Sequence, residues 1–169
     1  LGKGGQVGWE LQRSLAPLGT LVALGASSTD YAADFSQPDA VAATVRALRP
    51  DVVVNAAAHT AVDKAEREPE LARTLNALAP GVLAREAAAL GAWLVHYSTD
   101  YVFDGQGETP WEPDCKEYAP LNVYGQSKLG GELAVAQTLE KYFIVRIAWV
   151  FGLNGKNFIK TMLQVGKNH

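Results

Sequence analysis

The chain has 169 residues, a formal net charge of −3 and an apolar fraction of 48%, which is enough for one domain with a substantial core. No basic patch stands out, which argues against a nucleic-acid partner, and no apolar run approaches the roughly 20 residues of a membrane span. Cys115 is the only cysteine, so an internal disulfide cannot form, and we expect a cytoplasmic protein.

A glycine-rich loop stands at the beginning of the chain, with glycines at positions 2, 5 and 8. An amphipathic helix is predicted from Gln6 onward, ending at Pro17 and Gly19. Glycines let the backbone approach a pyrophosphate, and the amino end of the helix supplies amide donors. The motif alone is weak, because many glycine loops are only turns. We expect the strand that precedes such a loop to lie outside these residues, except for Leu1.

The next predicted strand, residues 20–24, ends at Gly25. Dinucleotide-binding units often carry an acid at this point for the adenosine ribose. Here Ala-Ser-Ser follows the glycine, and neither that acid nor an arginine for a 2′-phosphate is evident. Asp34 and Phe35 stand at a plausible position for an adenine, although a capping aspartate before a helix over 38–48 fits the spacing at least as well.

Two buried strands of the parallel type follow, separated by an alanine-rich helix. The first, beginning at Val52, ends in Asn-Ala-Ala-Ala, which either leaves room for a flat ligand or lets a helix pack tightly on the sheet. The second, residues 92–97, runs into a hydroxyl-rich end that contains Thr99. The helix between them, residues 68–90, should kink near Leu78 because Pro80 follows. His59 and His96 are expected to be structural.

Tyr124 and Lys128 stand four residues apart in a segment predicted to be helical, with Asn122 as its cap. This spacing stacks both side chains on one helix face. A neighbouring ammonium favours the phenolate and so lowers a tyrosine pKa from about 10. For such a pair alone, a partly exposed tyrosine beside an unrelated lysine is the commoner explanation. A strand over 142–149 and a last helix from Asn157 are predicted after it.

The strand–helix alternation predicts an α/β fold, a doubly wound parallel sheet of the Rossmann type. In such a sheet the carboxyl ends of the strands share one crevice. The hydroxyl, the phenol and the ammonium should then meet there beside a dinucleotide. This combination is specific in a way that its parts are not.

These features resemble the extended branch of the short-chain dehydrogenase/reductase superfamily, and most closely its dTDP-4-dehydrorhamnose reductase family. The resemblance rests on four motifs: GQVGWEL at 5–11, RPDVVVNAAAHTAVDKAE at 49–66, HYSTDYVF at 96–103 and PLNVYG at 120–125. It covers nearly the whole chain. It implies that residues 1–169 form an NAD(P)-binding domain, with the first strand and a C-terminal substrate domain lying outside them.

The resemblance implies reduction of the C4 ketone of dTDP-4-dehydro-L-rhamnose in dTDP-rhamnose biosynthesis, with NADPH or NADH as hydride donor. It implies that Tyr124 donates the proton, that Lys128 lowers the pKa of Tyr124 and holds the nicotinamide ribose, and that Thr99 hydrogen-bonds the ketone oxygen. Other positions match the cofactor site, with the pyrophosphate beside Gly2, Gly5, Gln6, Val7 and Gly8, the adenine beside Asp34 and Phe35, and the nicotinamide beside Ala57 and Ala58. Tyr101 and Trp149 match sugar-side positions.

In some relatives an acid at the position of Glu10 helps to hold Mg²⁺ at a subunit contact, so the resemblance allows a magnesium ion and a homodimer. The chain departs from the family at Gly25, where an acid is common, which leaves the choice of cofactor open. Two alternatives stay open as well. Some proteins of this shape bind the nucleotide only as regulatory subunits, and others are sugar-nucleotide epimerases or dehydratases, for which Asp100 is a suitable extra group.

Overall fold

The computed structural model describes residues 1–167. Within them, three parallel strands form one sheet in the order β1-β2-β3, with β1 at Val52–Asn55, β2 at Trp93–Thr99 and β3 at Tyr142–Ile147. Asn55 pairs with His96, and Thr99 pairs with Ile147. The carboxyl ends of all three strands therefore lie at the same edge of the sheet, which confirms the predicted α/β fold with a parallel sheet.

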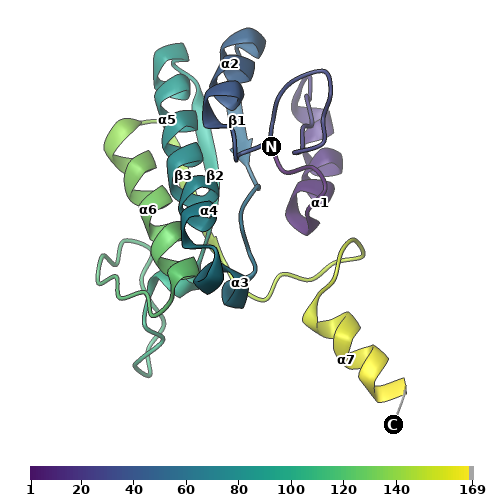
Figure 1. Ribbon diagram of the computed structural model, residues 1–169, viewed down its shortest axis with the longest axis vertical. Helices are drawn as coiled ribbons and strands as arrows, with labels where there is room; N and C mark the ends of the chain where they lie inside the picture. The colour runs from purple at the N-terminus through teal and green to yellow at the C-terminus, as the bar shows by residue number, and fades with distance from the viewer. Residues whose placement is uncertain (168–169) are drawn as a thin grey trace.

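Seven α-helices accompany the sheet within the described residues. They are α1 (Gln6–Leu15), α2 (Pro38–Leu48), α3 (Val62–Arg67), α4 (Pro69–Arg73), α5 (Ala79–Leu90), α6 (Val123–Thr138) and α7 (Phe158–Lys167). Helix α5 packs against both α2 and α6, and Figure 1 shows these helices standing side by side over one face of the sheet. Helix α2 has the predicted bounds, and α1, α6 and α7 begin within one residue of their predicted starts.

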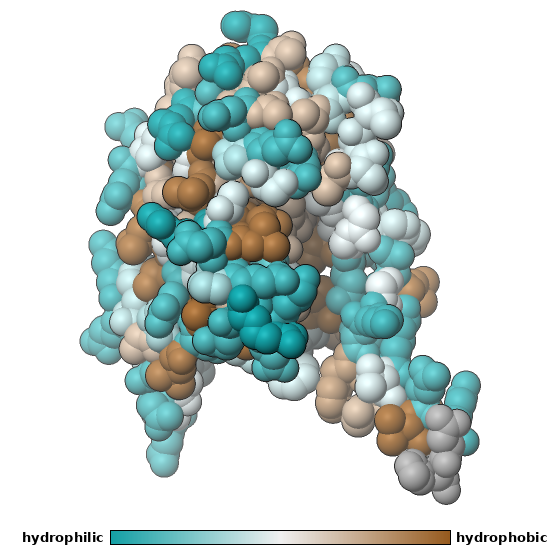
Figure 2. Space-filling view, viewed as in Figure 1, coloured by the Kyte–Doolittle hydropathy of each residue, from teal (hydrophilic) through white to brown (hydrophobic). Residues whose placement is uncertain are grey.

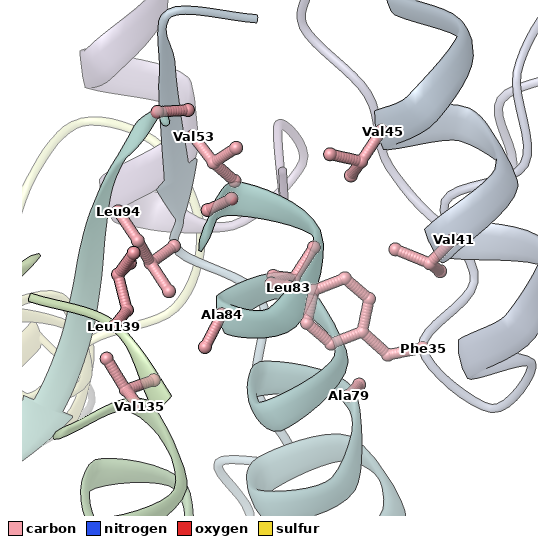
Figure 3. Packing of buried hydrophobic residues seen from close by; sticks show 12 residues of the cluster. Phe35, Val41, Val45, Val53, Ala79, Leu83, Ala84, Leu94, Val135 and Leu139 are labelled. Atoms are coloured by element: carbon pink, nitrogen blue, oxygen red, sulfur yellow. The ribbon is translucent and has the colours of Figure 1, made fainter. Parts of the chain in front are cut away.

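The main core fills the space between this face of the sheet and the helices. Phe35 is 3% exposed, and Figure 3 shows its ring beside Val41 of α2 and Leu83 of α5. Val53 and Leu94 close the cluster from the sheet side. Burial of such side chains contributes about 1.5–3 kcal/mol each, so this layer holds the helices that position the carboxyl edge of the strands.

The predicted strand at 20–24 is not a strand in the structure, because among the described residues only Leu1, Gly2 and Lys3 bond between this segment and β1. Leu1 bonds on the β1 side: its amino group donates to the Val54 carbonyl at 2.7 Å and its carbonyl accepts from the Ala56 amide at 3.1 Å. On the other side, the Gly2 amide donates to the Leu24 carbonyl at 2.8 Å. A groove of about 480 Å³ begins at Leu1 and runs between residues 20–24 and β1. Without a ladder along this groove, residues 20–24 stay extended but unpaired.

The helix predicted over 68–90 is interrupted where the proline was expected to disturb it. Helix α4 passes into a π-helical segment at Thr74–Leu78, and α5 begins at Ala79. The Ala79 amide bonds to the Thr74 carbonyl, five residues back. Pro80 has no amide hydrogen and cannot bond to the carbonyl four residues earlier, so a wider turn absorbs the mismatch.

The second face of the sheet is more open than the first. Val52, Trp93 and Phe143 point to this face and are 50%, 41% and 59% exposed. Helix α7 stands apart from the body of the molecule (Figure 1), and brown apolar surface marks that end in Figure 2. Among residues 1–167, none of the helices combines the length and the apolar character that crossing a bilayer requires.

Candidate active site

Tyr124 and Lys128 lie in the first turns of α6, as the spacing predicts. The Asn122 side chain caps this helix, accepting from the Gly125 amide at 2.8 Å. The helix begins very close to the end of β2, because a Cβ added at Gly125 would lie only 2.3 Å from the Tyr101 carbonyl oxygen. The Tyr101 and Tyr124 rings meet edge to face, with their centroids 5.6 Å apart. Glycine at 125 therefore allows the phenol to approach the end of the strand.

The Lys128 ammonium is buried and points to the sheet. Its side chain is among the largest that are fully buried, and Nζ donates to the Tyr97 carbonyl oxygen at 2.6 Å. Burial lowers the pKa of this ammonium from 10.5 to about 8, while the nearby Glu132 carboxylate acts in the opposite direction. Lys128 is thus a desolvated ammonium near the carboxyl end of β2, where a ribose hydroxyl could provide a further partner.

The prediction that Lys128 lowers the pKa of Tyr124 is wrong for this arrangement. Burial raises the pKa of the Tyr124 phenol, the Thr99 hydroxyl beside it lowers it, and the Asp100 carboxylate raises it again. Burial of the phenol is the largest of these effects. The phenol therefore stays protonated at neutral pH, which suits a proton donor.

Thr99 is buried at the end of β2, beside the phenol. Its hydroxyl donates to an Asp100 carboxylate oxygen at 3.1 Å and accepts from the Tyr101 amide at 3.2 Å. These bonds fix the rotamer of Thr99. The structure thus brings Thr99, Tyr124 and Lys128 together at one strand end, with Tyr101 as a neighbour.

The glycine loop packs directly on the carboxyl end of β1. A Cβ at Gly2 would lie 2.7 Å from the Ala56 carbonyl carbon, and one at Gly8 would lie 2.0 Å from the Gly2 carbonyl oxygen. Gly2 also has a φ of 86°, which favours glycine. By contrast, a Cβ at Gly4 would meet nothing within 4 Å. The loop is therefore closely packed at Gly2 and Gly8 and leaves open space at Gly4.

The amino end of α1 is free for a ligand. Gly5 is its N-cap residue, and no side chain among the described residues caps the helix. Unsatisfied amides at a helix start bind anions such as phosphate, so this loop fits a pyrophosphate. Gln6 and Val7 lie in this first turn, and Gln6 accepts from the Asn157 side chain at 3.1 Å. The segment after β3 therefore folds back onto the glycine loop.

Ala57 and Ala58 follow β1 in a loop that is held by polar side chains. The Asn55 side chain accepts from the Ala57 amide at 3.0 Å and meets His96 Nδ1 at 3.0 Å. Burial lowers the pKa of His96 to about 3, so this imidazole is neutral. The structural role predicted for His96 agrees with this position.

Asn76 is a buried residue that the sequence analysis missed. Its side chain brackets the His59 backbone, accepting from the His59 amide at 2.8 Å and donating to the His59 carbonyl at 3.0 Å. It also donates to the Ser127 hydroxyl at 2.9 Å. Asn76 therefore ties the loop that contains Ala57 and Ala58 to the helix that carries Tyr124 and Lys128. An asparagine within an alanine-rich helix was the only local signal.

A second missed feature is the ion pair between Glu132 and Arg146. The guanidinium of Arg146, on β3, binds both carboxylate oxygens of Glu132, with a shortest distance of 2.6 Å, and donates to the Tyr118 hydroxyl at 3.0 Å. Glu132 lies one turn beyond Lys128 on α6. The pair anchors the irregular segment before α6 to the helix and to β3. The spacing of four residues between Lys128 and Glu132 could have indicated that both side chains lie on one face of α6.

Four predicted site residues lie outside this cluster or are used elsewhere. The Phe35 ring belongs to the core, and Asp34 accepts from the Ser36 amide at 2.9 Å. Trp149 is 76% exposed and packs edge to face against Phe158 of α7. Glu10 pairs with Arg13 at 3.1 Å. Within residues 1–167, no three metal-ligating side chains gather in one place, so the structure gives no support to the predicted magnesium site.

A parallel α/β domain with a glycine loop, a strand-end threonine and a Tyr-x-x-x-Lys helix at one edge defines the class of Rossmann-like short-chain dehydrogenase/reductase domains. The chain belongs, over residues 1–169, to the family of the RmlD substrate binding domain.

Comparison with known proteins agrees with this family. The chain is 59% identical over 167 residues to the dTDP-4-dehydrorhamnose reductase of Shigella flexneri, a match that covers 98% of this chain and 55% of that protein. It therefore spans about half the length of the curated relatives it matches. Its fold is similar to a crystal structure of the Clostridium acetobutylicum reductase, with a TM-score of 0.91, 41% identity and coverage of 99% and 58% of the two chains. The Bacillus anthracis reductase, solved in complex with NADP, gives a TM-score of 0.88 at 37% identity, covering 99% of this chain and 58% of that one.

Proposed function

We propose that the full-length protein reduces the C4 ketone of dTDP-4-dehydro-L-rhamnose to dTDP-L-rhamnose, with NADPH or NADH as the reductant. The observation that carries the proposal is the convergence of Thr99, Tyr124 and Lys128 at the end of β2, beside a glycine loop that is open for a phosphate. The names of the relatives supply the substrate. The reaction would take place in the cytoplasm, and a homodimer stays a prediction.

The dinucleotide, when bound, supplies the hydride for the ketone carbon. Gln6 and Val7 would present amides to its pyrophosphate, because α1 begins there without a side-chain cap, and Gly5, whose amide donates to the Gly2 carbonyl, would shape the loop beneath it. Ala57 and Ala58 would leave space for the nicotinamide, since their small side chains follow β1. We propose that residues 1–169 form this NAD(P)-binding part, and that the sugar site needs further chain of the kind the longer relatives have.

The chain's own residues would manage the proton. The Tyr124 phenol, protonated because burial raises its pKa, would donate its proton to the alkoxide oxygen that forms from the ketone. The Thr99 hydroxyl would hold that oxygen, which requires it to turn away from Asp100. Lys128 would hold a ribose hydroxyl, and its bond to the Tyr97 carbonyl would keep the helix that carries Tyr124 on the end of β2.

The test is turnover by the full-length protein with dTDP-4-dehydro-L-rhamnose and NADPH. We expect NADPH absorbance to fall in step with the appearance of dTDP-L-rhamnose by mass spectrometry. Nucleotide binding without turnover would favour the regulatory-subunit alternative. Conversion of a sugar nucleotide without net oxidation of NADPH would favour an epimerase or a dehydratase.

A further inference from the structure

Lys3 lies across the end of segment 20–24, at the point where adenosine ribose is commonly recognised. Its amide donates to the Leu24 carbonyl at 3.0 Å, which fixes its backbone beside Gly25. A Cβ at Gly25 would lie 3.4 Å from Lys3 Cγ and 3.9 Å from Lys3 Cε. The methylene stem of Lys3 therefore lies within van der Waals distance of position 25, so an acid at this position would stand beside the Lys3 side chain.

The Lys3 charge has no acidic partner there. Position 25 is where many dinucleotide-binding units place the carboxylate that binds the ribose 2′-hydroxyl, and here a glycine occupies it. Among the ion pairs of residues 1–167, none involves Lys3, whose side chain is exposed. A free ammonium in place of the carboxylate favours a negatively charged group over a hydroxyl.

The neighbouring turn holds this geometry in place. The Ser28 amide donates to the Gly25 carbonyl at 2.9 Å, and the Gly25 amide donates to the Ser28 hydroxyl at 3.0 Å. These two bonds close a tight turn over residues 25–28 and leave Ser27 exposed at its tip.

We propose that Lys3 binds the 2′-phosphate of NADPH, and that Gly25 is the residue that permits it to do so. The inference rests on the proposed function for the presence of a dinucleotide site. A phosphate monoester carries about −1.5 to −2 charges near neutral pH, and lysine binds phosphate as a point charge. Because the site is open to solvent, we expect the full-length protein to bind NADPH about tenfold more tightly than NADH. An arginine after position 25 is the expected cation for a 2′-phosphate, whereas Lys3 lies before it in the chain, in the glycine loop.

The test is calorimetric binding of NADPH, NADH, 2′,5′-ADP and 5′-AMP to the full-length protein. The variant Lys3→Gln should weaken NADPH and 2′,5′-ADP about tenfold, while NADH and 5′-AMP change less than about twofold. Gly25→Asp should act in the same direction, because its carboxylate would repel the phosphate and pair with Lys3. The control is Lys141→Gln, at the amino end of β3 where Nζ donates to the Gly91 carbonyl, and it should leave all four ligands unchanged.

Salt dependence gives an independent readout. In the wild type, rising ionic strength should weaken NADPH binding more than NADH binding, and the difference should vanish in Lys3→Gln. Equal affinities of the wild type for NADPH and NADH, an equal loss of both in Lys3→Gln, or no dinucleotide binding at all would each overturn the inference. Selective NADPH binding without reduction of the sugar nucleotide would instead support it while contradicting the proposed function. Reduction of the sugar nucleotide together with NADPH binding that does not change in Lys3→Gln would support the proposed function and contradict the inference.

Discussion

The Lys128 ammonium lies 2.6 Å from the Tyr97 carbonyl oxygen, so a buried charge on α6 is held by the backbone of β2. This bond joins the helix that carries Tyr124 to the strand that ends in Thr99. The ammonium therefore holds α6 against β2.

The first prediction concerns the proton donor. Tyr124→Phe in the full-length protein should lower kcat by about 10²- to 10⁴-fold, the usual effect of a lost general acid. The phenylalanine ring keeps the edge-to-face contact with Tyr101, so NADPH affinity should change little. Steady-state kinetics together with NADPH titration would check this. Tyr31→Phe, on an exposed side chain, is the matched control, and near-normal turnover by Tyr124→Phe would contradict the assignment.

The second prediction follows from the lowered pKa of Lys128. Below about pH 8 both the folded and the unfolded protein hold this proton, so the cost of burying the charge is fully present. Between about 8 and 10.5 the folded state releases the proton first, and folding becomes more favourable as the pH rises. Relative to Lys128→Met, the free energy of unfolding of the wild type should therefore increase by at most about 3 kcal/mol across this window.

Chemical denaturation of both proteins at several pH values would measure that difference. Other titrating groups, including Tyr124, are common to the two proteins and cancel. A difference that stays flat from pH 8 to 10.5 would show that Lys128 is not a desolvated charge.

Local patterns in the sequence predicted most of the fold. The proline at position 38 and the apolar periodicity placed α2 at its observed bounds, and Pro80 placed the interruption of the long helix. The segment 20–24 could not be judged in this way, because a strand exists only when a neighbour completes its ladder. Its apolar character was correct, but within residues 1–167 only the Gly2 and Lys3 amides bond to it, at the Leu24 carbonyl, and no ladder forms along it.

The candidate site was predictable where its residues stand close in sequence or end a strand. Tyr124, Lys128 and Thr99 satisfy these conditions, and the parallel sheet brings them together. Asn76 and Arg146 do not, because their partners lie 51 and 14 residues away along the chain. Such contacts follow from the packing of α6 on its neighbours, which no local pattern encodes.

The third prediction concerns Asn76. Asn76→Leu keeps a similar volume but removes the bonds to the His59 backbone and to Ser127, leaving buried polar groups without partners. We expect the free energy of unfolding to fall by about 2–4 kcal/mol, with weaker NADPH binding because the loop at Ala57 loses its tie to α6. Urea denaturation and NADPH titration would measure both effects. Asn154→Leu, which loses one long contact of 3.5 Å, should change stability by about 0.5 kcal/mol at most.

The last prediction concerns the contact between α6 and the π-helical segment. Alanine favours a helix interior over glycine by up to about 1 kcal/mol, so sequence alone predicts that Gly131→Ala stabilises the protein. The structure predicts the opposite, because the added methyl would lie 2.1 Å from the Asn76 carbonyl oxygen, and backbone on both sides must then separate. That carbonyl is the one that Pro80 cannot bond. We expect a loss of about 2–3 kcal/mol in unfolding free energy, together with lower turnover, since the shift moves Lys128.

Gly166→Ala in α7, where the methyl meets nothing within 4 Å, is the matched control and should not destabilise the protein. Equal stability of Gly131→Ala and the wild type would show that α6 is free to move away from Asn76.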